Sequence, residues 1–326
     1  MRLRRLVFAI WIAFALLSLL PLDTVGAQEE QTRPARGTWA NTTDFSLVVT
    51  RGNSDIQTLG LKDTLEYKTA KGRSRLRVDA LRSDTSDDPY YLIEPGLTFE
   101  PGETPTGFTK KAVRPDAEPD VSRFFAEGRY EGNLPKKATW NAGASWDRND
   151  DAGILSRTIV FAGMGHVWRD RKDLEFRTSY GLSYTDRKEE VFDPEKEEEF
   201  LGARFVVDFK DTWGASTVYD ADLTSNLSLA DTSDYFVDLL QGVSVALSEH
   251  LALRVSLQLT YASEPALEEV DLLLRAILID PNGIPGDGDE FFETVETGGS
   301  EITVGEDVLR KEPLDTTFRT SLQIKF

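Results

Sequence analysis

The chain lacks several residue types that catalysis or cross-linking would need. Its 326 residues include no cysteine and only two histidines, His166 and His250. Without cysteine there is no disulfide framework, no thiolate metal site and no cysteine nucleophile. Basic residues are scarce too, with 37 Lys and Arg against 56 Asp and Glu, a formal net charge of −19. Since phosphate neutralisation needs a clustered surplus of positive charge, we expect no nucleic-acid partner.

Long apolar runs are also rare, and the one present lies at the N-terminus. Basic residues open the chain, Val7 to Leu20 is apolar except for Ser18, and Val25-Gly26-Ala27 follows. This order is typical of an export signal, so we predict a signal peptide over 1–27, cleaved before Gln28. The alternative is a membrane anchor, but the run is shorter than the about 20 residues that a helical span needs. Residues 28–38 are then a short N-terminal periplasmic segment.

After Trp39 the dominant period of the sequence is two. Leu251 to Tyr261 alternates apolar with small or polar residues, and Phe318 to Phe326 does the same. Such stretches match the about 9–11 residues that a tilted strand needs to cross a bilayer. Twelve segments follow this pattern: 39–51, 55–67, 73–82, 121–132, 138–147, 154–167, 173–184, 200–210, 214–227, 234–247, 251–262 and 314–326. The sequence therefore predicts an all-β fold, a transmembrane antiparallel up-and-down barrel of about 12 strands over 39–326.

The lengths of the connections support this architecture. Short turns such as Asn133 to Lys137 alternate with connections that include three long loops, 83–120, 185–199 and 263–313. Short periplasmic turns and long extracellular loops are typical of transmembrane barrels. A soluble sandwich or a lipocalin-like barrel would also alternate. Aromatic residues at the strand ends and the many charges on the polar faces favour the membrane, because a dry core could not hold those charges unpaired.

Three points stay open at this stage. The apolar run from Val270 to Ile279 either extends above the membrane as a hairpin or raises the strand total to fourteen. The strand at 154–167 can be phased either way. Asp63 falls on the apolar face of its strand, which predicts a bulge or an interface position.

The polar faces of the strands mix both signs of charge. Members include Arg75, Arg77, Asp79, Glu127, Arg129, Glu131, Arg204, Asp208, Asp222, Asp238, Arg254 and Arg319. One hypothesis is a conducting lumen whose charges select solutes. The other is an interior filled by salt-bridged side chains. Since eight strands fill their interior and sixteen leave a channel, about 12 strands with balanced charges favour a narrow or occluded lumen.

Two short motifs carry a family resemblance. Gly52-Asn53-Ser54 lies between the first two strands, where glycine and asparagine supply the positive φ of a hairpin turn. The closing run from Leu314 to Leu322 ends in Lys325-Phe326, and a terminal Phe resembles the assembly signal of outer-membrane barrels. With these motifs the chain resembles the salt-induced outer-membrane protein family (YdiY-like), a domain of unknown function. The resemblance implies an outer-membrane barrel and supplies no activity and no catalytic residues.

No catalytic set, resident metal or cofactor is predicted. His166 is expected near a strand end beside Trp168 and His250 in a short turn, and Ser54 has no histidine near it in sequence. A weak calcium candidate consists of Asp280, Asn282, Asp287 and Asp289, interleaved with glycine, but its spacing fits no EF-hand. We therefore expect a polar loop there.

Together these features predict a non-enzymatic outer-membrane barrel of the Gram-negative envelope, with a role related to salt or osmotic stress as the resemblance implies. A narrow, porin-like solute channel is the first alternative, and an outer-membrane hydrolase is the second. Expected partners are outer-membrane lipid, lipopolysaccharide and the barrel assembly machinery through the C-terminal strand. The long loops hold most of the acidic surplus, so we also expect diffuse attraction of divalent cations.

Overall fold

The computed structural model describes residues 37–50, 56–84, 90–101, 108–113, 121–150, 152–281, 290–295 and 298–325. The predicted signal peptide, the Gly52-Asn53-Ser54 turn and Phe326 lie outside the described residues. No helix in the described part of the chain is long and apolar enough to cross a membrane.

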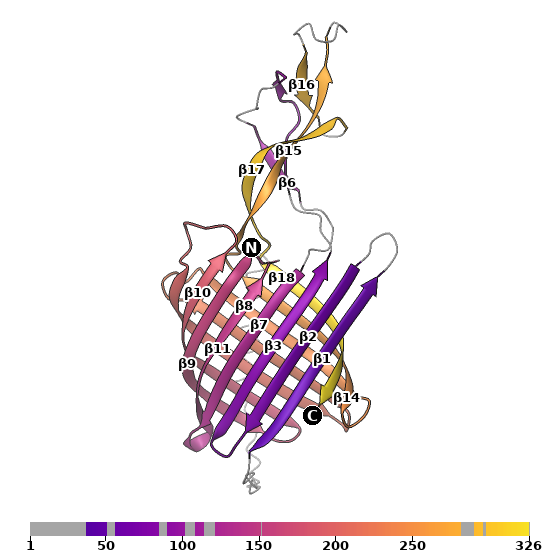
Figure 1. Ribbon diagram of the computed structural model, residues 1–326. Coiled ribbons are helices and arrows are strands. Elements are labelled where there is room, and N and C mark those ends of the chain that lie inside the picture. The colour runs from indigo at the N-terminus through magenta and orange to yellow at the C-terminus, as the bar shows by residue number, and fades with distance from the viewer. Residues whose placement is uncertain are drawn as a thin grey trace. The chain divides into compact units, whose positions relative to one another are not determined.

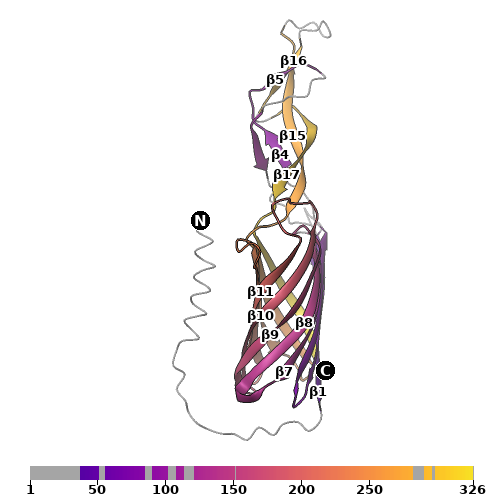
Figure 2. The ribbon, with the colours of Figure 1, turned by 90° about the vertical axis from the view of Figure 1, so that its left-hand side faces the viewer.

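Twelve antiparallel strands close into a barrel, which confirms the predicted fold class. Figures 1 and 2 show these strands inclined around the barrel wall. The strands are β1 (Thr38–Thr50), β2 (Ile56–Lys68), β3 (Gly72–Asp84), β7 (Val121–Asn133), β8 (Ala138–Asn149), β9 (Ile154–Asp170), β10 (Leu174–Glu189), β11 (Glu199–Trp213), β12 (Thr217–Ser228), β13 (Tyr235–Ala246), β14 (Leu251–Ala262) and β18 (Leu314–Lys325). Each corresponds to one predicted segment. The order around the ring is β1-β18-β14-β13-β12-β11-β10-β9-β8-β7-β3-β2.

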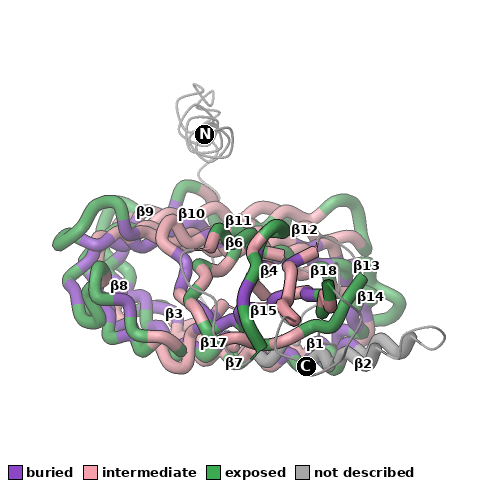
Figure 3. Tube along the Cα trace, turned by 90° about the horizontal axis from the view of Figure 1, so that it is seen from above, coloured by how far each residue is buried: buried purple, intermediate pink, exposed green. Residues whose placement is uncertain are grey.

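The barrel carries its apolar residues on the outside and its polar residues on the inside. On β14, Leu253 is 45% exposed whereas the neighbouring Arg254 is 5% exposed. Figure 3 shows buried and exposed residues alternating along the barrel strands. Because successive side chains of a strand point to opposite faces, alternation of period two gives each strand one face of each kind. The barrel therefore has the polarity expected in lipid, with a wet or paired interior.

Aromatic residues cluster on the outer surface near the strand ends. At the end with the short turns, Trp39 contacts Tyr67 and Tyr130 contacts Trp140, with ring centroids 4.4 Å and 5.2 Å apart. At the other end Trp146 and Tyr184 are 39% and 43% exposed. Two aromatic bands of this kind are what the two interfaces of a bilayer favour.

The strand at 154–167, whose phase was open, belongs to β9 with Ile159 and Phe161 facing inward and buried. Register shifts interrupt its pairing on both sides, near Asp147 on β8 and near Phe176 on β10. A bulge inserts one extra residue and so reverses the facing of everything beyond it. These irregularities explain why the sequence alone allowed both phases.

Two of the predicted long loops are partly folded, which corrects the prediction. Within 83–120 and 263–313 lie β4 (Tyr90–Ile93), β5 (Thr98–Phe99), β6 (Lys110–Val113), β15 (Leu267–Ile279), β16 (Phe291–Thr294) and β17 (Ser300–Arg310). They form a second sheet of order β5-β16-β15-β4-β6, with β17 also paired to β15. Ile93 and Leu274, 1% and 0% exposed, lie in its core. The run at Val270–Ile279 thus adds no barrel strand. The barrel has twelve strands and not fourteen.

The third predicted loop, 185–199, is shorter than expected because β10 extends to Glu189 and β11 begins at Glu199. The remaining connection contacts the start of the second sheet. Val191 bridges Leu267, and Arg310 Nη2 lies 2.9 Å from Asp193 Oδ2. Lys311 Nζ adds an ion pair to Glu190 Oε2 of the connection at 3.9 Å. The acidic connection therefore holds basic residues that lead back to the barrel.

Candidate functional site

The barrel interior is the strongest candidate site because buried charged side chains from nearly every strand meet there. Strands β3, β7 and β11 supply most of the arginines and β11, β12 and β13 most of the aspartates. Buried members include Arg73, Asp79, Glu127, Arg129, Glu131, Arg177, Arg204 and Arg254. Burying a charge is costly unless it is paired, so the positions of the partners decide what this lumen can do.

Arg75 on β3 spans the lumen. Its Nη2 lies 3.0 Å from Asp222 Oδ2 on β12, and its Nη1 lies 3.2 Å from Asp208 Oδ1 on β11. In a ring of twelve, β3 and β12 are six places apart, the greatest separation that the ring allows. Opposite walls of the barrel therefore lie within reach of one guanidinium group.

Neighbouring ion pairs extend this crossing. Arg129 Nη2 on β7 donates to Asp208 Oδ2 at 2.8 Å, and Arg204 Nη2 on β11 donates to Glu127 Oε2 at 3.1 Å. We call Arg75, Asp208, Asp222, Arg129, Glu127 and Arg204 the cross-lumen belt. Beyond it, Arg123 on β7 reaches Asp238 on β13 at 3.3 Å, again between strands six places apart. The belt consists of charge-assisted hydrogen bonds between walls that share no backbone pairing.

Inward-facing glycines accompany the belt on the wall formed by β9 and β10. Gly163 and Gly181 are register partners. A Cβ on Gly163 would lie 2.3 Å from the Tyr180 carbonyl oxygen, and one on Gly181 would lie 2.2 Å from that of Ala162. Only glycine tolerates so close an approach of two backbones.

The belt leaves a cavity of about 580 Å³ on one side, counting the space open to solvent. Guanidinium groups and carboxylates line it together, among them Arg123, Arg157, Asp147 and Asp238, with Phe125, Ile159, Phe236 and Leu240 between them. Arg157 and Asp147 form a two-bond pair at 3.0 Å and 2.9 Å. The cavity therefore offers both signs of charge on a partly apolar wall.

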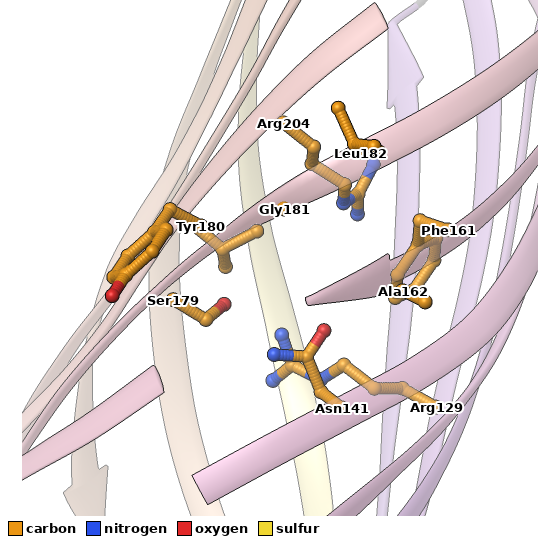
Figure 4. Close-up of a pocket in the computed structure, with 10 residues that line it drawn as sticks. Arg129, Asn141, Phe161, Ala162, Ser179, Tyr180, Gly181, Leu182 and Arg204 are labelled. Atoms are coloured by element: carbon orange, nitrogen blue, oxygen red, sulfur yellow. The ribbon is translucent and has the colours of Figure 1, made fainter. Parts of the chain in front are cut away.

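A second cavity of about 220 Å³ lies against β8 to β11. Figure 4 shows the polar ends of Arg129, Asn141 and Arg204 directed into it, while the Tyr180 ring points away. Asn141 Nδ2 and Arg204 Nε are buried without a hydrogen-bond partner in the described structure. Buried donors of this kind are normally satisfied, and the site has the size and polarity to hold a water molecule.

The residues considered for catalysis lie apart from these cavities. His166 faces outward on β9, with its ring 4.6 Å from that of Trp168. His250 lies in the turn before β14, and its Nδ1 is 3.1 Å from the Lys325 carbonyl oxygen. Ser54 lies outside the described residues. The structure thus brings neither histidine to the lumen.

The calcium candidate is only partly described. Asp280 follows β15 directly, whereas Asn282, Asp287 and Asp289 lie outside the described residues. Among the residues that are described, no group of three or more His, Cys, Asp or Glu is placed to hold a metal ion.

The sequence predicted which strand faces are polar, but it did not predict which inward charged residues pair with one another across the lumen. Alternation placed Arg75, Glu127 and Asp208 on inward positions, which the structure confirms. It could not predict that β3 contacts β12, because these strands are never neighbours in the sheet. The one available signal was the balance of inward charges, which favoured pairing over an open channel.

Comparison with solved structures finds several barrels of low similarity. An anion-selective porin from Comamonas acidovorans is 8% identical, with 89% of this chain and 99% of that chain covered and a TM-score of 0.34. OmpT, an outer membrane protein of Vibrio cholerae, is also 8% identical, with coverage of 89% and 97% and a TM-score of 0.34. A FadL homologue of Pseudomonas aeruginosa is 10% identical, with coverage of 89% and 75% and a TM-score of 0.28. No property of the present chain is inferred from them.

No curated protein matches the chain. A family model does match, over residues 43–279, which takes in most of the barrel and β4, β5, β6 and β15 of the second sheet. The chain belongs to the family described as protein of unknown function, DUF481.

Proposed function

We propose that this protein is a non-enzymatic outer-membrane β-barrel of the Gram-negative envelope, whose lumen is closed along its axis by the cross-lumen belt. The outward apolar faces and the two aromatic bands support a bilayer location. The observation that carries the closed lumen is the contact of Arg75 with Asp208 and Asp222, from opposite walls. The barrel then anchors the second sheet at the end where the long connections emerge.

The partners proposed for this role follow from its location. Membrane lipid and lipopolysaccharide surround the barrel, and the assembly machinery engages the C-terminal strand. A relation to salt or osmotic stress comes from the family resemblance alone. Divalent cations gather by diffuse attraction at the acidic connections.

Planar-bilayer recordings with the purified protein test the closed lumen. We expect little or no steady conductance from the wild type, and a clear rise when Arg75→Ala and Asp222→Ala are combined. Arg148→Ala is the matched control, because Arg148 pairs with Asp150 at an exposed position outside the lumen. A large steady conductance of the wild-type protein would contradict the closed lumen.

A narrow solute channel is the second candidate, favoured by the cavity of about 580 Å³ beside the belt. It predicts small, reproducible wild-type conductance that belt substitutions enlarge. Hydrolase activity is the least supported alternative, because both histidines lie away from the cavities. A lipase activity of the wild-type protein that Ser54→Ala abolishes would support the hydrolase alternative.

A further inference from the structure

The cavity of about 580 Å³ is lined by four arginines and four carboxylates, and one of these arginines has no carboxylate of its own. Three pairs form within the lining, at 3.3, 2.9 and 3.1 Å: Arg123 with Asp238, Arg157 with Asp147, and Arg204 with Glu127. The fourth carboxylate, Asp79, pairs at 2.6 Å with Arg319 of β18, from outside the lining. The arginine that remains is Arg77 on β3.

Arg77 makes no hydrogen bond to any residue that the structure describes, and its one ion pair is long. Its Nη1 lies 3.7 Å from Asp222 Oδ2, an oxygen that Arg75 already bonds at 3.0 Å. Its register partner, Glu127, is bonded by Arg204. The Arg77 side chain is only 13% exposed. Since a charge inside a protein is costly unless it is paired, the donors of this guanidinium are available to a ligand.

An aromatic ring holds this guanidinium in place. Cζ of Arg77 lies 4.3 Å from the ring centroid of Phe125 on β7, which also lines the cavity. A guanidinium that lies over a ring engages it with its face, whereas its N–H groups point outward in its own plane. The edge of such a guanidinium matches a planar carboxylate, which accepts two parallel hydrogen bonds. Arg77 is therefore arranged to bind a carboxylate from solution.

The rest of the lining limits the size and the charge of the ligand. Only one cation of the lining lacks its own carboxylate, so a monovalent anion is enough to neutralise it. Ile159 and Leu240, which are 2% and 8% exposed, add an apolar surface to the same cavity. The volume of about 580 Å³ includes space open to solvent, so the ligand is small.

We infer that this cavity is a binding site for a small monocarboxylate, whose carboxylate is held by the edge of the Arg77 guanidinium and whose short apolar body lies against Ile159 and Leu240. The inference deepens the proposed function and rests on the closed lumen for the way in. Glu127 and Arg204 belong both to the belt and to the lining, so the belt is one wall of the site and the ligand enters from the end with the long connections.

A series of ligands of one size tests the site in the wild-type protein. The probe is propionate, followed by saturation-transfer NMR with the folded protein in deuterated detergent. We expect a saturable signal from propionate and binding weaker by about ten-fold or more for propionamide, which has the same shape without the charge. Chloride should compete poorly, because a spherical ion cannot accept two parallel hydrogen bonds from one guanidinium. Equal binding of propionamide, or equal competition by chloride, would overturn the inference.

Variants of Arg77 test which residue holds the ligand. Arg77→Gln should weaken propionate binding by about ten-fold or more, and Arg77→Lys by several-fold, because lysine keeps the charge but lacks the planar fork. Arg148→Gln, at an exposed pair outside the lumen, is the control and should bind as the wild type does. Heat-modifiable gel mobility checks the fold of each variant. Wild-type affinity in a folded Arg77→Gln protein would overturn the inference, and the ligand series decides alone should that variant fail to fold.

The binding site and the closed lumen fail in distinguishable ways. A protein that conducts steadily but binds propionate through Arg77 contradicts only the closed lumen. A protein that does not conduct and shows no saturable propionate binding contradicts only the monocarboxylate site.

Discussion

At the scale of single residues, Asp63 shows how one polar side chain is held on the apolar face of the barrel. Its carboxylate accepts hydrogen bonds from Thr43 Oγ1 at 2.6 Å and from Asn41 Nδ2 at 3.1 Å. The register of β1 and β2 is regular across this point, so the bulge that the sequence suggested is absent. Asp63 is therefore an outward residue with local partners.

Replacing this carboxylate should stabilise the barrel. Asp63→Asn keeps acceptor and donor atoms for Asn41 and Thr43 but removes a charge that faces hydrocarbon. We expect the free energy of unfolding to rise by about 1 kcal/mol, measured by urea unfolding in vesicles. Asp211→Asn, at the end with the short turns, is the control and should change it little. A loss of stability in Asp63→Asn would show that the hydrogen bonds from Thr43 and Asn41 to the ionised carboxylate outweigh the cost of its charge.

Asp231 lies in the connection between β12 and β13, and hydrogen bonds within this turn lower the pKa of its carboxyl group. Ser233 donates to its Oδ1 from the side chain at 2.7 Å and from the backbone at 2.9 Å, and these bonds lower the pKa of Asp231. A lowered pKa stabilises the turn above the pKa of the unfolded chain, and this stabilisation is lost as the pH falls through the folded value. Ser233→Ala should therefore raise the pKa in an NMR titration, and an unchanged pKa would leave the backbone bond as its cause.

At the scale of elements, the belt shows that strands remote in the ring depend on one another. Arg75 side-chain exposure is 12%, and its partners Asp222 and Asp208 are 18% and 17% exposed. Removing one member of a buried network leaves the others uncompensated, whereas removing both charges relieves the imbalance.

We therefore expect Arg75→Met to lower the free energy of unfolding by about 3–5 kcal/mol, and Arg75→Met with Asp222→Leu to recover part of it. Urea unfolding in vesicles measures both. Arg148→Met removes an exposed pair and should cost less than about 1 kcal/mol. Equal effects of Arg75→Met and Arg148→Met would mean that the belt contributes no more than a surface ion pair.

The second sheet is an element with its own small core, and its stability should be separable from that of the barrel. Leu274→Ala removes a fully buried side chain and should destabilise this sheet by about 2–5 kcal/mol, seen as faster protease cleavage within 263–313. The gel mobility shift of the barrel on heating should stay unchanged. Leu278→Ala, at a position 56% exposed, is the control. Loss of the barrel shift would show that the two sheets fold together.

At the scale of the whole molecule, the net charge of −19 is concentrated in a few connections. Segment 83–120 holds nine acidic and three basic residues, 185–199 eight and three, and 263–312 fourteen and three. Many of these acidic residues lie in or beside the strands of the second sheet. Strands β4 to β6 come from the first of these segments, and β15 to β17 come from the last.

Replacing the parts of these segments that lie outside the barrel strands by short Gly-Ser turns should leave a folded barrel that no longer responds to Mg²⁺. The reason is that summed charge gathers counter-ions without any designed site. Binding to lipopolysaccharide vesicles as a function of Mg²⁺ concentration measures the response, with heat-modifiable mobility as the check on folding. A full response in the shortened protein would place the cation effect in the barrel.

The sequence by itself determined the twelve barrel segments, their ends within a few residues and, outside 154–167, the face on which their residues lie. These properties are local, because a period of two fixes the facing of a side chain within its own strand. Tertiary structure alone decided that Arg75 meets Asp222, that segments 83–120 and 263–313 share one sheet, and that Arg77 is left without a carboxylate of its own. Those contacts depend on how the ring closes and how closely its walls approach, and no local pattern encodes the distance between residues so far apart along the chain.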